Sequence, residues 1–398
     1  MELKIYTLTS ALHDRRRIEE DSARFVSLLQ RHTAVTLNVV QDGLEGFGGG
    51  VVFVRTGGTE MQFAMHAPQI TGRPVYLLTS GGNNSLAASM EILSYVRSHG
   101  GSGEILHGTA DYIGRRLTEI ARVEEARQNL QGRTVGVIGQ PSDWLISSGI
   151  DESALRTQLG IKVTHINMDE LTAEVAKVTE IPESTRRRLK DCNSEWFDGA
   201  LRIYEALRVI IGRHGLNALT LRCFDLLTSL RNTGCLALAL LNEEGVPSSC
   251  EGDVPALLTM MAAQALTGSC GFQANPSRID PETGEMVFAH CTVPLDMVRN
   301  YTYATHFESG IGVALHGELP EGDATLMKVS GDLKRLFVRD VTLLRNQYED
   351  NLCRTQVVLR AEPEAAVELL NRPIANHHVI LSGHWRSAVE SLFAPLML

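Results

Sequence analysis

Short apolar runs that alternate with longer amphipathic segments dominate the first two thirds of this chain. The runs LKIYTLTS, TLNVVQ, GGGVVFVRTGGTE and PVYLLTSGGNNS come first, and helix-like stretches with apolar residues at helical spacing lie among them. Strands that alternate with helices form parallel sheets covered by helices on both faces. We therefore expect a doubly wound α/β domain over residues 1–130.

The same alternation restarts after Gly132 with RTVGVIGQPSDWLI and continues through KVTHINMDEL, LNALTLRCFDLL and VPALLTMMAAQALTG. It predicts a second doubly wound parallel sheet over residues 131–272. Over residues 273–398, β-rich runs follow one another between Gly, Pro and Asp turns and leave little room for helices. This texture predicts a mainly antiparallel barrel or sandwich, closed by a strand and an amphipathic helix.

Charge and composition exclude several classes of partner. The 398 residues carry a formal net charge of −10, which argues against nucleic acid or an anionic membrane as the principal partner. The seven cysteines include no CxxC pair, so we expect reduced thiols. Because the N-terminus lacks the pattern of a signal peptide and no run reaches about 18 apolar residues, we expect a cytoplasmic protein without a membrane span.

Two glycine-containing loops follow apolar strands, GGTE at residues 57–60 and SGGNNS at residues 80–85. Ligands of open α/β sheets bind at the carboxyl ends of strands, and Asn83 and Asn84 can both donate and accept hydrogen bonds. The alternative is an ordinary strand-to-helix turn with Asn84 or Ser85 as the helix N-cap. Neither loop matches a P-loop or a GxGxxG motif.

The stretch SCEGDVPALLTM is the strongest local signal for chemistry. Glu251 and Asp253 gather carboxylates just before an apolar helix, where the helix N-terminus favours negative charge. Asp253 is well placed to cap that helix, and Pro255 is tolerated in its first turn. Glu251 precedes the cap and is free to point into a cleft.

Histidines supply the second set of candidate ligands. His377, His378 and His384 fall in ANHHVILSGHW, and His290 lies on an expected strand in FAHCTVP. Adjacent strand residues point to opposite faces, so at most one of His377 and His378 can share a site with Glu251. Carboxylate, carboxamide and imidazole ligands suit Mn²⁺, Mg²⁺ or Co²⁺, whereas no thiolate set is arranged for structural zinc. Cys250 and Cys291 adjoin two candidate ligands and are read as small packing residues.

These residues give the chain a resemblance to the superfamily of L-fucose isomerase and L-arabinose isomerase. The matching elements are Glu251 in CEGD, a helix ending in ALTG at Gly268, and His377 in ANHHVILSGH, in that order. The resemblance implies two flavodoxin-like domains followed by an antiparallel β domain. It also implies an aldose-ketose isomerase that works through a cis-enediol with a divalent metal, Mn²⁺ before Mg²⁺ or Co²⁺.

The resemblance implies a role for each of several residues. Glu251 is the expected base and metal ligand, and His290, His377 and Asn275 complete the metal shell. Asn275 stands where the fucose-type enzymes have a second acid, and a carboxamide can coordinate but cannot exchange a proton near neutral pH. A metal-bound water or Asp225, near the end of LRCFDLL, is the candidate replacement. Asp225 is otherwise a hydrogen-bond acceptor at the end of a strand.

Members of that superfamily form trimers or hexamers, so a homo-oligomer is expected, with the SGGNNS loop reaching a neighbour's site. Asn83, Asn84, Arg278 and His384 are the candidate substrate contacts. Arg278 would suit an anionic sugar such as sulfoquinovose, or else it is an ordinary surface charge. A deoxy sugar or a pentose is the alternative substrate. Two other functions stay open, namely a sugar-binding or regulatory homologue without catalysis and a metal-dependent epimerase or lyase.

Overall fold

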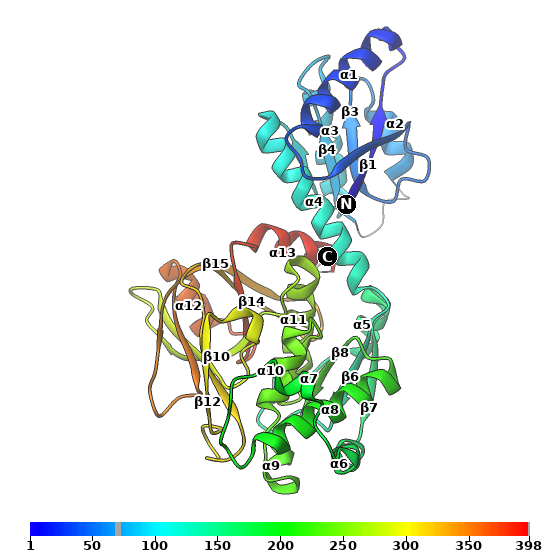
Figure 1. Cartoon of the computed structure of the whole chain (residues 1–398). Coiled ribbons are helices and arrows are strands. Elements are labelled where there is room, and N and C mark those ends of the chain that lie inside the picture. Colours follow the sequence, from blue (N-terminus) through cyan, green and yellow to red (C-terminus); the bar gives the residue numbers. More distant parts are fainter. Residues whose placement is uncertain (68–72, 397–398) are drawn as a thin grey trace. The chain divides into compact units, whose positions relative to one another are not determined.

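The computed structural model describes residues 1–67 and 73–396, and the chain divides into two compact units (Figure 1). The first unit contains Met1–Ala126 and the residues from Ser391 onward, and the second contains Arg127–Glu390. The second unit thus holds both the second parallel sheet and the β-rich region. The three-domain division at residues 130 and 272 stays a prediction. None of the described helices combines the length and the apolar character that crossing a membrane requires.

Five parallel strands form the sheet of the first unit, in the order β2-β1-β3-β4-β5 that flavodoxin-like sheets have. One face packs against α1 and α4 and the other against α2 and α3, so the sheet is doubly wound as predicted. The strands are β1 (Glu2–Leu8), β2 (Thr36–Asp42), β3 (Gly50–Val54), β4 (Val75–Leu78) and β5 (Gly103–Leu106). The helices are α1 (Arg15–Gln30), α2 (Glu60–His66), α3 (Ser85–Ser98) and α4 (Ala110–Leu130).

A second parallel sheet has the order β7-β6-β8-β9, which repeats the first pattern with one strand fewer. Its strands are β6 (Thr134–Ile138), β7 (Lys162–Ile166), β8 (Ala218–Leu221) and β9 (Ser248–Cys250). Its helices are α5 (Glu152–Leu159), α6 (Met168–Lys177), α7 (Glu183–Arg186), α8 (Phe197–His214), α9 (Asp225–Ser229), α10 (Cys235–Glu243) and α11 (Val254–Thr267). The sequence predicted this parallel sheet correctly.

The β-rich region forms a closed antiparallel barrel in the order β10-β11-β16-β15-β14-β17, which decides between the barrel and the sandwich. The barrel strands are β10 (Phe272–Ile279), β11 (Glu285–His290), β14 (Gly322–Val329), β15 (Leu336–Gln347), β16 (Thr355–Arg360) and β17 (His378–Ser382). A hairpin of β12 (Asn300–Ala304) and β13 (Ala314–Glu318) accompanies it, and α13 (Arg386–Phe393) follows β17. The sequence pattern missed α12 (Pro363–Asn371), which begins at a proline that the first helical turn tolerates.

One continuous hydrophobic cluster joins the second sheet to the barrel. It includes Leu219 and Leu221 from β8, residues of α8 and α10, and barrel residues such as Phe288 and Leu326. Burial of this apolar surface fixes the barrel against the sheet within the second unit. Residues far apart in the sequence can therefore meet there with defined geometry.

Candidate metal centre

Glu251 lies in the turn between β9 and α11, at the carboxyl end of a parallel strand. Its φ is +67° and that of Gly252 is +72°, so two consecutive residues adopt the left-handed conformation. A Cβ atom on Gly252 would lie 2.6 Å from the carbonyl oxygen of Gln140, so only glycine fits there. This turn places Glu251 at the carboxyl end of the parallel strands, the edge at which open α/β sheets bind ligands.

Two histidines reach the same place from the barrel. The strand β10 pairs Asn275 with Ala289 of β11 and Ala274 with His378 of β17. His290, at the end of β11, and His377, just before β17, therefore flank β10 at the same level. Both imidazoles are buried, and their ring centroids lie 5.4 Å apart.

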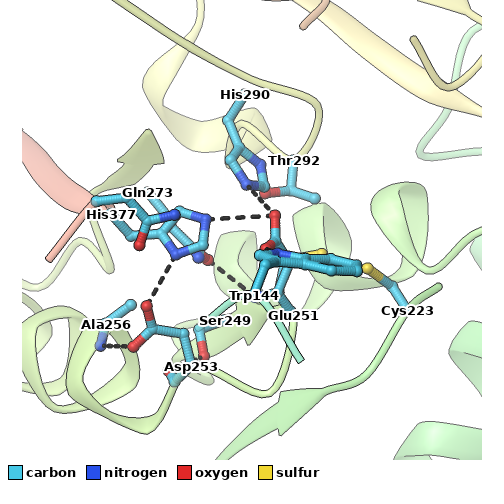
Figure 2. A network of polar contacts seen from close by, with 12 residues as sticks. Trp144, Cys223, Ser249, Glu251, Asp253, Ala256, Gln273, His290, Thr292 and His377 are labelled. Carbon is cyan, nitrogen blue, oxygen red and sulfur yellow. Dashed lines mark hydrogen bonds and ion pairs between the residues drawn. The ribbon is translucent and has the colours of Figure 1, made fainter. Parts of the chain in front are cut away.

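Figure 2 shows how Glu251, His290 and His377, here called the triad, converge. The Oε1 atom of Glu251 lies 3.4 Å from Nε2 of His377 and 3.8 Å from Nε2 of His290. One ligand atom from each residue lies within 4.8 Å of the others. Among the described residues, Nε2 of His377 has no hydrogen-bond partner. A buried carboxylate and two imidazole nitrogens that face one point form a set that fits a divalent cation.

Asp253 holds His377 in the orientation that the triad needs. Its Oδ1 accepts a hydrogen bond from the Ala256 amide at 2.7 Å, which confirms the predicted helix cap. Its Oδ2 accepts a hydrogen bond from Nδ1 of His377 at 2.8 Å, which points Nε2 toward Glu251. The sequence did not reveal this second role, because the cap alone accounted for the residue.

A buried lysine balances the charge of Asp253. The Nζ atom of Lys328, on β14, lies 3.6 Å from Oδ1 of Asp253, and both side chains are fully buried. Burial tends to raise the pKa of Asp253, but the charge of Lys328 and the bond to His377 outweigh it and lower that pKa to about 2. Asp253 is therefore an anion that fixes the proton of His377 on Nδ1.

The protonation of the triad shows how strongly it attracts positive charge. Burial opposes ionisation of Glu251, but the nearby imidazoles of His290 and His377 hold its pKa well below the ordinary value. Burial also opposes a charge on His377, yet Asp253 and Glu251 raise its pKa to about 9. Burial lowers the pKa of His290, whose Nδ1 lies 3.0 Å from the Thr292 hydroxyl. A proton or a metal cation is stabilised between these groups.

His378 points the other way from His377, as strand geometry requires. It is buried, and its ring contacts Phe288 and Phe337 with centroids 5.8 Å and 5.6 Å away. Of these two adjacent histidines, only His377 lies beside Glu251 among the described contacts, so their side chains point to opposite faces as the sequence predicted.

Two amides of β10 also lie in this region. Oε1 of Gln273 accepts a hydrogen bond from the backbone N–H of Cys250 at 2.8 Å, which ties β10 to the triad turn. Asn275 lies two residues further on the same strand, so its side chain shares that face. Among the described residues, Nε2 of Gln273 and Oδ1 of Asn275 are buried without a partner. A free carboxamide oxygen on this face is compatible with the predicted metal role of Asn275, which stays a prediction.

Other predicted residues lie in ion pairs or in exposed turns. Asp225 begins α9, and its carboxylate lies 3.0 Å from Nε of Arg222. Arg278 is exposed and pairs with Glu349, and His384, half exposed, lies 3.7 Å from Asp323. The structure thus gives these three side chains local partners, and it does not bring them into the triad.

Asn83 and Asn84 lie in the first unit, in the turn before α3. Both are exposed and have positive φ, and Asn84 occupies the N-cap position without a side-chain capping bond. Asn84 thus stands at the predicted start of the helix but does not cap it through its side chain, and the predicted substrate contact of these residues stays a prediction. Cys250 and Cys291, beside Glu251 and His290, are buried free thiols.

The chain resembles sulfoquinovose isomerases. It is 26% identical to one from Alkalicoccus urumqiensis over 285 residues, which is 67% of this chain and 62% of the relative. It is 24% identical to one from Priestia aryabhattai over 283 residues, again 62% of the relative, and 24% identical to one from Clostridium sp. (strain MSTE9) over 327 residues. The matched segment thus spans less than two thirds of the length of the first two relatives. No protein-family model matches the chain.

Three residues near the triad escaped the sequence interpretation. Trp144, in the loop after β6, donates a hydrogen bond from Nε1 to Oε2 of Glu251 at 2.7 Å. His306 is buried beside His290, and burial and that neighbour lower its pKa to about 4. Glu308 lies two residues further, and burial and the charge of Glu251 raise its pKa. The position of Trp144 after a parallel strand was the one available signal.

Proposed function

We propose that this protein is a metal-dependent aldose-ketose isomerase, with sulfoquinovose as the first sugar to test. The observation that carries the proposal is the buried triad of Glu251, His290 and His377, whose ligand atoms lie within 4.8 Å of one another. The names of the relatives support the reaction class and the sugar. A deoxy sugar or a pentose is the alternative substrate.

The triad, with Asn275 as a fourth ligand, would hold the cation. When bound, a divalent ion such as Mn²⁺, or else Mg²⁺ or Co²⁺, supplies the positive charge that stabilises negative oxygen beside an ionising C–H bond. Asp253 keeps His377 in the tautomer that offers Nε2, and Thr292 restrains His290. Burial of the triad excludes bulk water, which strengthens these electrostatic interactions.

A carboxylate must carry the proton from one sugar carbon to its neighbour through the cis-enediol. We assign this role to Glu251, because it is ionised and lies inside the site. Asp225 is the other candidate, although Arg222 engages its carboxylate. The two assignments predict opposite results for two isosteric variants.

The test is the exchange of solvent deuterium into C2 of the sugar. Metal-depleted protein is incubated with sulfoquinovose, L-fucose and L-arabinose in deuterated water, with and without Mn²⁺, and the sugars are followed by NMR. We expect Mn²⁺-dependent exchange and ketose formation in the wild type. Glu251→Gln should abolish exchange, whereas Asp225→Asn should retain it. The reverse result for the two variants would transfer the role of base to Asp225.

The same assay separates the two alternative functions. Fragment products or an epimeric aldose without ketose would indicate a lyase or an epimerase with related chemistry. Sugar binding without any exchange would indicate a binding homologue. We also propose a homo-oligomer, a trimer or a hexamer, in which the SGGNNS loop reaches a neighbour's site. Sedimentation analysis gives the subunit number, and Asn83→Ala together with Asn84→Ala tests the loop.

A further inference from the structure

The two oxygens of the Glu251 carboxylate have different partners. Oε1 faces Nε2 of His377 at 3.4 Å and Nε2 of His290 at 3.8 Å. Oε2 accepts the hydrogen bond from Nε1 of Trp144 at 2.7 Å (Figure 2). The indole N–H can only donate, so it binds Oε2 as a hydrogen-bond donor. It does so on the side of the carboxylate that is not turned to the two histidines. This arrangement leaves Oε1 for a cation, and the second lone pair of Oε2 remains for the proton that Glu251 would carry as the base.

The loop that carries Trp144 is fastened to the Glu251 turn. The Ser142 amide donates a hydrogen bond to the Glu251 carbonyl oxygen at 2.9 Å. Arg222, after β8, donates to the Pro141 carbonyl oxygen at 2.9 Å and lies 3.2 Å from the Asp143 carboxylate. These contacts position the indole before any ligand arrives, so the Trp144 hydrogen bond requires little further ordering.

The ring of Trp144 is the second feature. Trp144 is 52% exposed although its N–H, the one polar group of its side chain, is bonded to Glu251, so the side-chain surface that it exposes is apolar. Phe224 contacts it edge-on at 4.8 Å between centroids, and Phe224 in turn contacts His306 at 5.4 Å. An apolar aromatic surface beside a few convergent polar groups is typical of a small-molecule site. The C–H face of a sugar fits such a surface, while its hydroxyl groups turn to the polar atoms.

We propose that Trp144 positions Glu251 for one-oxygen coordination through its indole N–H and provides the stacking face for the sugar through its ring. The stacking part rests on the proposed isomerase function, and the positioning part requires only that the triad binds a cation. Trp144 acts on the metal through Glu251 and contacts the substrate directly.

Two substitutions separate the two roles. Trp144→Phe keeps an aromatic ring but removes the N–H, and Trp144→Leu removes both. We expect both variants to bind Mn²⁺ about 10- to 100-fold more weakly than the wild type, the usual effect of losing a partner of a metal ligand. Measured by calorimetry with saturating Mn²⁺, the Kd for sulfoquinovose should stay within about threefold of wild type in Trp144→Phe and rise about tenfold in Trp144→Leu. Trp196→Phe, outside the site, is the matched control and should change neither constant.

A spectroscopic readout does not depend on turnover. The double variant with Trp196→Phe and Trp385→Phe leaves Trp144 as the single tryptophan, and paramagnetic Mn²⁺ should quench its fluorescence at a saturable site. Wild-type Mn²⁺ affinity in Trp144→Phe, or no quenching, would overturn the positioning role. Equal sugar affinity in Trp144→Phe and Trp144→Leu would overturn the stacking role. The wild type could also bind Mn²⁺ more tightly than the Trp144 variants and yet show no deuterium exchange. That outcome would refute the isomerase proposal and still support the positioning role.

Discussion

Asp253→Asn should separate two functions that one buried carboxylate performs. Asp253 uses Oδ1 for the Ala256 amide and Oδ2 for Nδ1 of His377, so both oxygens must accept. Asparagine caps helices about as well as aspartate, but it has only one accepting oxygen. If that oxygen still accepts the Ala256 amide, the new NH₂ group faces Nδ1 of His377. It then favours the tautomer with hydrogen on Nε2, and a protonated Nε2 cannot bind a metal.

The magnitude follows from Lys328. Its ammonium group is fully buried, lies 3.6 Å from Asp253 and has no hydrogen bond among the described residues. Removing the negative partner of a buried ion pair leaves an uncompensated charge, which costs about 3 to 5 kcal/mol. We therefore expect Asp253→Asn to lower the free energy of unfolding by about that amount and Mn²⁺ affinity by about 10- to 100-fold.

The double variant with Asp253→Asn and Lys328→Met separates the loss of stability, caused by the unpaired lysine, from the loss of Mn²⁺ affinity, caused by the reoriented His377. Removing the lysine removes the uncompensated charge, so most of the stability should return, while the Mn²⁺ affinity should remain low. Urea unfolding gives the stability, calorimetry gives the affinity, and Lys328→Met alone completes the cycle. Wild-type Mn²⁺ affinity in the double variant would show that Asp253 does not orient His377. Unchanged stability in Asp253→Asn would refute the argument from the buried charge.

Three further predictions concern the same site. Gly252→Ala places a Cβ atom 2.6 Å from a backbone oxygen and should lower the free energy of unfolding in urea by about 2 to 4 kcal/mol. The control Gly268→Ala, at a position with left-handed φ but open space, should lower it by about 1 kcal/mol. Equal losses in the two variants would contradict this prediction. Mn²⁺ at about a hundred times its Kd should stabilise the wild type by about 2.7 kcal/mol, and the same concentration should not stabilise Glu251→Gln. A thermal unfolding midpoint of the wild type that changes with neither Mn²⁺ nor EDTA would count against a metal site. Asn275→Ala should weaken Mn²⁺ binding about tenfold in calorimetry, because it removes a buried oxygen that has no partner among the described residues. Unchanged affinity would remove Asn275 from the proposed ligands.

Local patterns were sufficient for much of the fold. The alternation of strands and helices predicted both parallel sheets, because such segments have few other ways to bury their apolar faces. The cap at Asp253 followed from residue types next to one another in the sequence. The choice between barrel and sandwich did not, since the same alternating strands can form either, and closure depends on the pairing of β10 with β17.

The candidate site was only partly predictable. Glu251 and His377 stood out by residue type and by resemblance. Lys328 could not be found, because a lysine in a strand is normally exposed, and its burial follows from the barrel's position near Asp253. Trp144 could not be predicted either, because no pattern in the loop sequence indicates that its N–H reaches Glu251.

The sequence by itself determined that His377 and His378 face opposite ways, because successive residues of an extended segment alternate. The alternation did not say which of them faces Glu251; the resemblance pointed to His377, and the tertiary structure places it there. That choice depends on how the barrel packs against α11 and β9, where Asp253 binds one imidazole and Phe288 and Phe337 enclose the other. Local geometry follows from neighbours in the chain, whereas the site depends on burial shared between segments that are distant in the sequence.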